Sequence, residues 1–188
     1  MVKNNTHKVI YARDFEFYST PEEVSPLINR VVAEIREEIL NLDERVSGKC
    51  RLILTELLTN ALKHSDCPKT VIGVMIDKEK IQISKLDSGR AFYLPEWKER
   101  EALKWPLEGR EGQKIVIYED QMCCLFGQIE NQNKVVFSHE DYSVQMPPRP
   151  KDILEHFGLM ILTKSSDSFI YHYNPATKTN LFQAEILL

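Results

Sequence analysis

A line of polar side chains runs along the leucine-rich stretch LILTELLTNALKHSD, residues 52–66. Glu56, Asn60, Lys63 and His64 are separated by three, four or eight residues, so a helix would carry all four on one side. A carboxylate within hydrogen-bond reach of a hydroxyl or a water can act as a general base. An amide oxygen can bind Mg²⁺, which keeps several waters and needs few protein ligands. The spacing therefore raises the question of why a helix whose leucines pack on a core also aligns a carboxylate, an amide and two basic groups on its other side.

Each of these four residues also has an ordinary explanation. Glu56 alone is typical of a helix surface, and Asn60 could bond within its own helix. Lys63 and His64 could reach a phosphate from the next turn, or they could stabilise the helix C-terminus as cations beside the macrodipole. The sequence leaves these alternatives open.

A second candidate group is Asp87 with Gly89, in the stretch KLDSGRAF that follows a β-rich run. A carboxylate at the end of a strand can accept hydrogen bonds from a ligand, and glycine lets the backbone approach closely. The alternative is a plain turn, because Asp, Ser and Gly are common turn residues.

The elements that must position these residues follow from hydrophobic periodicity and turn residues. A helix is expected from Pro21, capped by Ser19 or Thr20, to about Leu40, and a second one over about 44–64. A further helix is expected over 151–165. The expected strands are 7–19, 70–77, 80–87, 114–120, 122–129, 134–140, 168–174 and 179–188. This order predicts a two-layer α/β (α+β) sandwich, with an antiparallel sheet and helices on one face.

Composition excludes several classes of protein. The chain has 188 residues, enough for one domain, and a net charge of −4 with scattered basic residues, which argues against nucleic-acid binding. No apolar run approaches the length of a membrane span, and the N-terminus has no apolar signal core, so a cytoplasmic protein is expected. Cys50, Cys67, Cys123 and Cys124 have no zinc or CxxC spacing and are expected to be buried thiols, with redox chemistry as the alternative.

Three stretches in order, TELLTNALKHS, KLDSGRAF and HFGLMIL, resemble the motifs of the GHKL ATPase superfamily, which includes histidine-kinase ATPase domains, gyrase, Hsp90 and MutL. Within it the chain is most similar to the small anti-sigma-factor serine/threonine kinases. The resemblance covers about 20–92 and 153–188. It implies one ATP-binding domain over 1–188, with residues 98–150 as an insertion in the region of the ATP lid.

The resemblance also implies roles for individual residues. Glu56 would be the general base, Asn60 the ligand of Mg²⁺, and Asp87 the acceptor for the exocyclic amine of adenine. Further nucleotide-binding residues implied by it are Lys63, His64, Gly89, Ala91, Gly158, Leu159 and Thr179.

The chain departs from the family motifs at two positions. Ala91 stands where the second motif ends in glycine, and a positive φ there would be strained. His156 stands where the third motif begins with glycine. The apolar period around it predicts a helix that begins near Asp152, which would place Gly158 inside the helix. The N–H of Gly158 would then be committed to the helix, and fewer backbone N–H groups would remain to bind phosphate.

The function implied is transfer of the γ-phosphate of Mg-ATP to a serine of a partner protein. That partner would be a STAS-type anti-anti-sigma protein, with a sigma factor as the second client, and a homodimer is a further expected state. The alternatives are a nucleotide-binding interaction module with weak or no turnover, a detached histidine-kinase ATPase domain, and ordinary core and turn residues throughout. The segment 98–150 is expected to be an ordered β-rich unit whose three strand-like runs pair among themselves.

Overall fold

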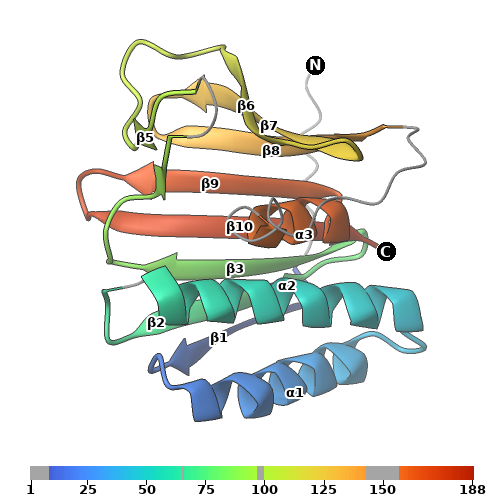
Figure 1. Cartoon of the computed structure of the whole chain (residues 1–188). Helices are drawn as coiled ribbons and strands as arrows, with labels where there is room; N and C mark the ends of the chain where they lie inside the picture. Colours follow the sequence, from blue (N-terminus) through green and yellow to red (C-terminus); the bar gives the residue numbers. More distant parts are fainter. Residues whose placement is uncertain (1–8, 65, 97–99, 143–156) are drawn as a thin grey trace, which may run out of the picture.

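The computed structural model of the chain describes residues 9–64, 66–96, 100–142 and 157–188. In these residues the chain forms three helices and ten strands (Figure 1). The helices are α1 (Pro21–Glu38), α2 (Glu44–His64) and α3 (Phe157–Ser165). The strands are β1 (Tyr11–Phe17), β2 (Thr70–Ile76), β3 (Lys80–Asp87), β4 (Tyr93–Leu94), β5 (Leu103–Lys104), β6 (Lys114–Glu119), β7 (Cys123–Asn131), β8 (Lys134–Asp141), β9 (Ser168–Asn174) and β10 (Thr179–Leu187).

Eight of the strands form one sheet in the order β1-β2-β3-β10-β9-β8-β7-β6, and each neighbouring pair is antiparallel. The C-terminal strand β10 therefore lies between β3 and β9, which brings the end of β3 beside the start of β10. The predicted mixed α/β fold with an antiparallel sheet is confirmed, whereas the GHKL fold within this class stays a prediction.

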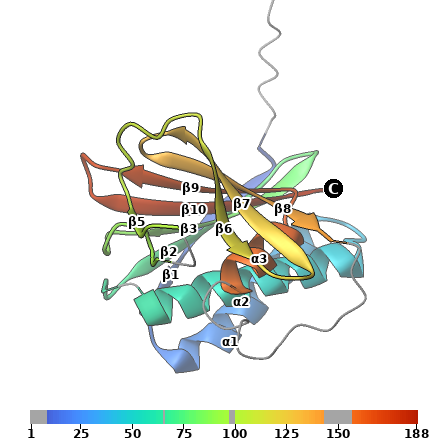
Figure 2. The ribbon, with the colours of Figure 1, turned by 45° about the horizontal axis from the view of Figure 1, so that its top comes forward.

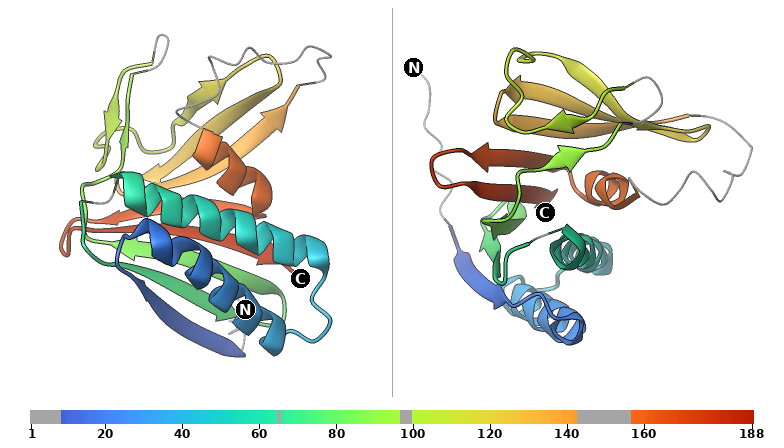
Figure 3. Two further views of the ribbon diagram at one scale, coloured as in Figure 1. Left: turned by 60° about the horizontal axis from the view of Figure 1, so that its bottom comes forward. Right: turned by 60° about the vertical axis from the view of Figure 1, so that its left-hand side comes forward.

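The three helices lie on one face of the sheet (Figure 3). α1 begins after Thr20 because Pro21 occupies the first helical position, where a missing N–H removes no helical bond. The prediction that a side chain caps this helix is wrong, because the Thr20 hydroxyl makes no capping hydrogen bond. α1 then buries Leu27, Val31 and Ile35 at helical spacing. These side chains belong to the core between helices and sheet.

Three strands of the 98–150 segment, β6, β7 and β8, extend the main sheet instead of forming a separate unit (Figure 2). β6, β7 and β8 pair with one another, as the sequence predicted. β8 also pairs with β9 over four residues, Lys134 to Phe137, and this junction was not predicted. The short β4–β5 pair was missed as well, since two-residue strands carry no periodic pattern.

An aromatic cluster packs the extension and the preceding loop against the main sheet. Phe137 of β8 stacks on Phe169 of β9 with ring centroids 4.9 Å apart. Trp105, only 1% exposed, contacts Phe92 at 5.1 Å and Tyr171 at 5.5 Å. The apolar side of the extension therefore packs on its own chain.

Residues 143–156 lie outside the described part of the chain. The expected helix start near Asp152, the departure at His156 and the end of the proposed insertion all fall there. Among the described residues no helix combines the length and apolarity that a membrane crossing requires.

Candidate functional site

The helix α2 divides its side chains between the core and a polar side. Ile53, Leu54, Leu57, Leu58 and Ala61 are buried against the sheet or α1. Glu56 and Asn60, four residues apart, are half-buried. The same helix therefore contributes to the core and carries the candidate residues, but Leu52, one of the leucines expected in the core, is 51% exposed.

The start of α3 lies directly over Glu56 and Asn60. A Cβ added to Gly158 would lie 2.9 Å from Oε2 of Glu56 and 3.7 Å from both amide atoms of Asn60. No L side chain fits at 2.9 Å unless the carboxylate moves. The glycine thus lets α3 approach the polar side of α2, and the structure brings these three predicted residues together.

Glu56 and Asn60 retain free bonding capacity. Within the described part of the chain, neither the Glu56 carboxylate nor the Asn60 amide has a hydrogen-bond partner. Burial raises the pKa of Glu56, and the positive charge of Lys63, two turns along α2, opposes the shift. A carboxylate with a raised pKa and free oxygens is suited to accept a proton from a hydroxyl.

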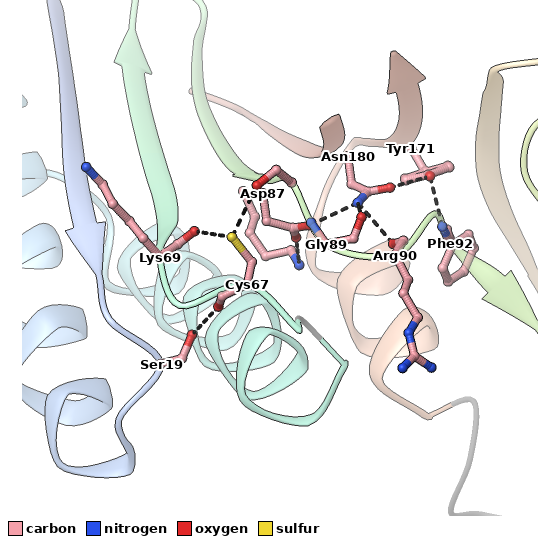
Figure 4. Close-up of polar contacts among 11 residues, drawn as sticks. Ser19, Cys67, Lys69, Asp87, Gly89, Arg90, Phe92, Tyr171 and Asn180 are labelled. Atoms are coloured by element: carbon pink, nitrogen blue, oxygen red, sulfur yellow. Dashed lines mark hydrogen bonds and ion pairs between the residues drawn. The ribbon is translucent and has the colours of Figure 1, made fainter. Parts of the chain in front are cut away.

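Asp87, at the end of β3, is the centre of a buried polar network (Figure 4). Its Oδ2 accepts a hydrogen bond from Lys85 Nζ at 2.6 Å, in an ion pair whose two side chains are 5% and 4% exposed. Its Oδ1 accepts from the backbone N–H of Gly89 at 3.0 Å and from Asn180 Nδ2 at 2.9 Å. The carboxylate is therefore held by donors from β3, the following turn and β10.

The network continues through Asn180 to the loop after β3 (Figure 4). Asn180 Nδ2 also lies within hydrogen-bond distance of the carbonyl oxygens of Gly89 and Arg90, at 3.2 and 3.0 Å. Tyr171 donates its hydroxyl to Asn180 Oδ1 at 2.7 Å and accepts from the backbone N–H of Phe92 at 3.0 Å. Burial raises the pKa of Tyr171 well above its ordinary value, so it stays a donor at neutral pH. These bonds fix the turn that carries Asp87.

Lys85 and Asn180 were missed by reasoning from the sequence. Lys85 interrupts an otherwise apolar inward face of β3, which also carries Ile81 and Ile83, and that interruption was the available signal. Asn180 is visible only through the pairing of β10 with β3, where it stands opposite Asp87. No local pattern indicates that register.

Two predicted residues stand outside the network. The Thr179 hydroxyl lies 2.8 Å from the Thr177 hydroxyl, and its neighbour Asn180 makes the contact with Asp87. The Leu159 side chain belongs to the buried core. If Leu159 contacts a ligand, it does so through its backbone.

Ala91 and Gly89 are not among the residues with a left-handed backbone. Neither has a positive φ, so the strain anticipated at Ala91 does not arise. Ala91 is half-buried and packs against the core. The departure from glycine at this position is therefore tolerated by the turn.

Lys63 and His64 occupy the last turn of α2 and are exposed. Burial of its ring lowers the pKa of His64, and the charges of Lys63 and Lys85 lower it further. Both predicted roles, phosphate contact and stabilisation of the helix end, are compatible with these positions.

Cys67 differs from the other cysteines. Cys50, Cys123 and Cys124 are buried, as expected, but Cys67 is only half-buried. Its Sγ lies 3.0 Å from the carbonyl oxygen of Lys69 and 3.3 Å from Oγ of Ser88 (Figure 4). The hydrogen bond between Ser88 and Cys67 lowers the pKa of this thiol. The contact ties the loop after α2 to the turn after Asp87.

Mg-ATP, the ligand that the resemblance implies, would need an oxygen ligand for its metal ion and a hydrogen-bond acceptor for its base. The Asn60 amide oxygen is a hard ligand of the kind that Mg²⁺ accepts, although among the described residues no three His, Cys, Asp or Glu side chains converge to hold a metal. At the base end, Asp87 is almost fully covered and already accepts three hydrogen bonds. A carboxylate offers about four acceptor positions, so about one remains for a ligand.

Comparison with protein-family models and with curated proteins finds no match to this chain.

Proposed function

We propose that this chain is an ATP-binding domain of the GHKL type that acts as a regulatory serine/threonine kinase on a small partner protein. The observation that carries the proposal is the approach of Gly158 in α3 to Glu56 and Asn60 in α2. It joins residues about a hundred positions apart in the sequence, from two stretches that resemble successive motifs of the superfamily.

The chain's own residues have distinct tasks in this proposal. Asn60 holds a magnesium ion through its amide oxygen, and Asp87 accepts a hydrogen bond from the base. Glu56 accepts the proton of the attacking serine hydroxyl, for which its raised pKa is suited. Mg-ATP, when bound, supplies the phosphoryl group and neutralises charge, so that positioning accounts for most of the catalysis.

The client that the resemblance implies is a STAS-type anti-anti-sigma protein, with a sigma factor as the second candidate. The proposal places the chain and its client in the cytoplasm.

A second candidate function is a nucleotide-binding interaction module without turnover. Ala91 and His156 favour it, because they stand where the second and third motifs of the superfamily have glycine. The side chains of Lys85 and Asp87 are covered, so in either function a neighbouring segment must move before a base can reach them. Measuring ADP release by the chain with its client separates the two, since only the kinase releases ADP.

Replacing Asn60 with alanine is expected to remove most of the magnesium dependence of ATP binding. The amide oxygen is the ligand that the chain itself supplies in this proposal, so without it Mg²⁺ adds little to affinity. Titration of ATP in Mg²⁺ and in EDTA checks this, with Asn29→Ala in α1 as the control, because Asn29 contacts Arg51 on another surface. An unchanged ratio of the two dissociation constants in Asn60→Ala would remove Asn60 from the site.

A further inference from the structure

The Lys85–Asp87 pair gives the base end of the site a donor as well as an acceptor. Lys85 Nζ lies 2.6 Å from Asp87 Oδ2 and 5.1 Å from the centre of the Phe182 ring. Both charged side chains come from the inward face of β3, two residues apart. Attraction to the carboxylate and to the ring face holds the ammonium group beside the acceptor.

The bonding capacity left at this pair is specific. Asp87 uses three of its roughly four acceptor positions on Lys85, Asn180 and Gly89. An ammonium group has three N–H donors, and one of those of Lys85 points to Asp87. Counted over the described residues alone, about one acceptor of Asp87 and about two donors of Lys85 therefore remain for a ligand. The edge of the ligand that contacts Lys85 and Asp87 must therefore carry a hydrogen-bond donor next to an acceptor.

We propose that Lys85 makes the base subsite accept guanine nucleotides as well as adenine nucleotides, an inference that rests on the nucleotide site proposed above. Guanine places its N1–H donor next to the O6 acceptor, so Asp87 accepts from N1–H and Lys85 donates to O6. Lysine to guanine O6 is a common specific contact in nucleic-acid recognition. Adenine carries a donor, the N6 amine, where guanine carries O6, so its contact is with Asp87 and does not depend on Lys85.

Lys85 is the residue on which this tolerance depends. Without its ammonium group the free group at this end is the carboxylate of Asp87, which accepts from the adenine amine and repels the guanine O6. An apolar residue at 85 therefore leaves a subsite selective for adenine. Lys85 in this account is a specificity-determining residue.

Calorimetric titration of ATP, GTP and ITP into the full chain and its Lys85→Met variant tests the proposal. ITP carries O6 and N1–H without the 2-amino group, so it isolates the two contacts. For the wild type, all three dissociation constants are expected to agree within about tenfold. In Lys85→Met, GTP and ITP should weaken relative to ATP by about tenfold or more, the usual effect of losing a hydrogen bond to a charged group.

Lys80→Met is the matched control, because Lys80 lies at the other end of β3 and pairs with Glu185. It should leave the ratio of GTP to ATP affinity unchanged. If the wild type bound ATP but bound GTP roughly a hundredfold or more weakly, this inference would be overturned while the proposed nucleotide site would stand. An equal loss of all three ligands in a Lys85→Met protein that thermal unfolding shows to be folded would also overturn it. A folded wild-type chain that binds none of them would instead refute the proposed nucleotide site itself.

Discussion

Asp87→Ala is expected to lower the free energy of unfolding by about 3–5 kcal/mol, which is the usual effect of removing one partner of a buried ion pair. Lys85 would remain buried with an unpaired charge, and the side chain of Asn180 would lose one of its acceptors. Urea denaturation followed by circular dichroism measures this loss through the midpoint at constant slope.

The double variant Lys85→Met/Asp87→Ala is the control for this expectation. Because it removes the stranded charge together with its partner, it should recover more than half of the lost stability. A double variant as unstable as Asp87→Ala would show that the ion pair is not the origin of the effect. Loss of less than about 1 kcal/mol in Asp87→Ala would contradict the burial of the pair.

Glu56→Ala is expected to reduce any phosphoryl transfer by about 10²- to 10⁴-fold, which is the range that a general base contributes. ATP binding should persist, because the contacts proposed for the base and for Mg²⁺ belong to Asp87 and Asn60. Single-turnover transfer and ATP titration on the same protein separate the two effects. Glu44→Ala, at the exposed start of the same helix, is the matched control and should retain both.

The pH dependence of turnover gives a second check on Glu56. A general base works in its deprotonated form, and burial raises the pKa of this carboxyl above its ordinary value. Turnover should therefore rise with pH through the raised pKa, and should fall on acidification at a higher pH than an ordinary glutamate would give. If Glu56→Ala turned over at the wild-type rate, the assignment of a general base would be wrong.

The sequence predicted most of the fold because long amphipathic elements carry periodic patterns. α2 spans Glu44–His64, which matches the expected 44–64, and the expected strand pairs around KEK and in the 98–150 segment are present. The joining of β8 to β9 was not predictable, since an edge-to-edge pairing between distant strands leaves no local pattern. Whether the three added strands are an insertion relative to a family stays a prediction.

The candidate site was predictable where it lies on one element and less so where elements meet. Glu56 and Asn60 follow from helical spacing, whereas their approach to Gly158 depends on how α3 packs on α2. Asp87 was selected because KLDSGRAF, at the end of a strand, resembles the second motif of the superfamily. Its partners Lys85 and Asn180 depend on side-chain direction and on the register of β10, so the ion pair that dominates this end was missed.

Calorimetric titration of ATP with Mg²⁺ into the wild-type chain and into Asp87→Asn tests the central claim most directly. The account predicts that the wild type binds ATP and that Asp87→Asn binds it about tenfold or more weakly, since a hydrogen bond to a charged group contributes roughly 1.5–3 kcal/mol. Thermal unfolding of both proteins establishes that each is folded at the temperature of the titration. A folded wild type that binds no ATP, or an Asp87→Asn variant with an unchanged dissociation constant, would contradict the assignment of this site.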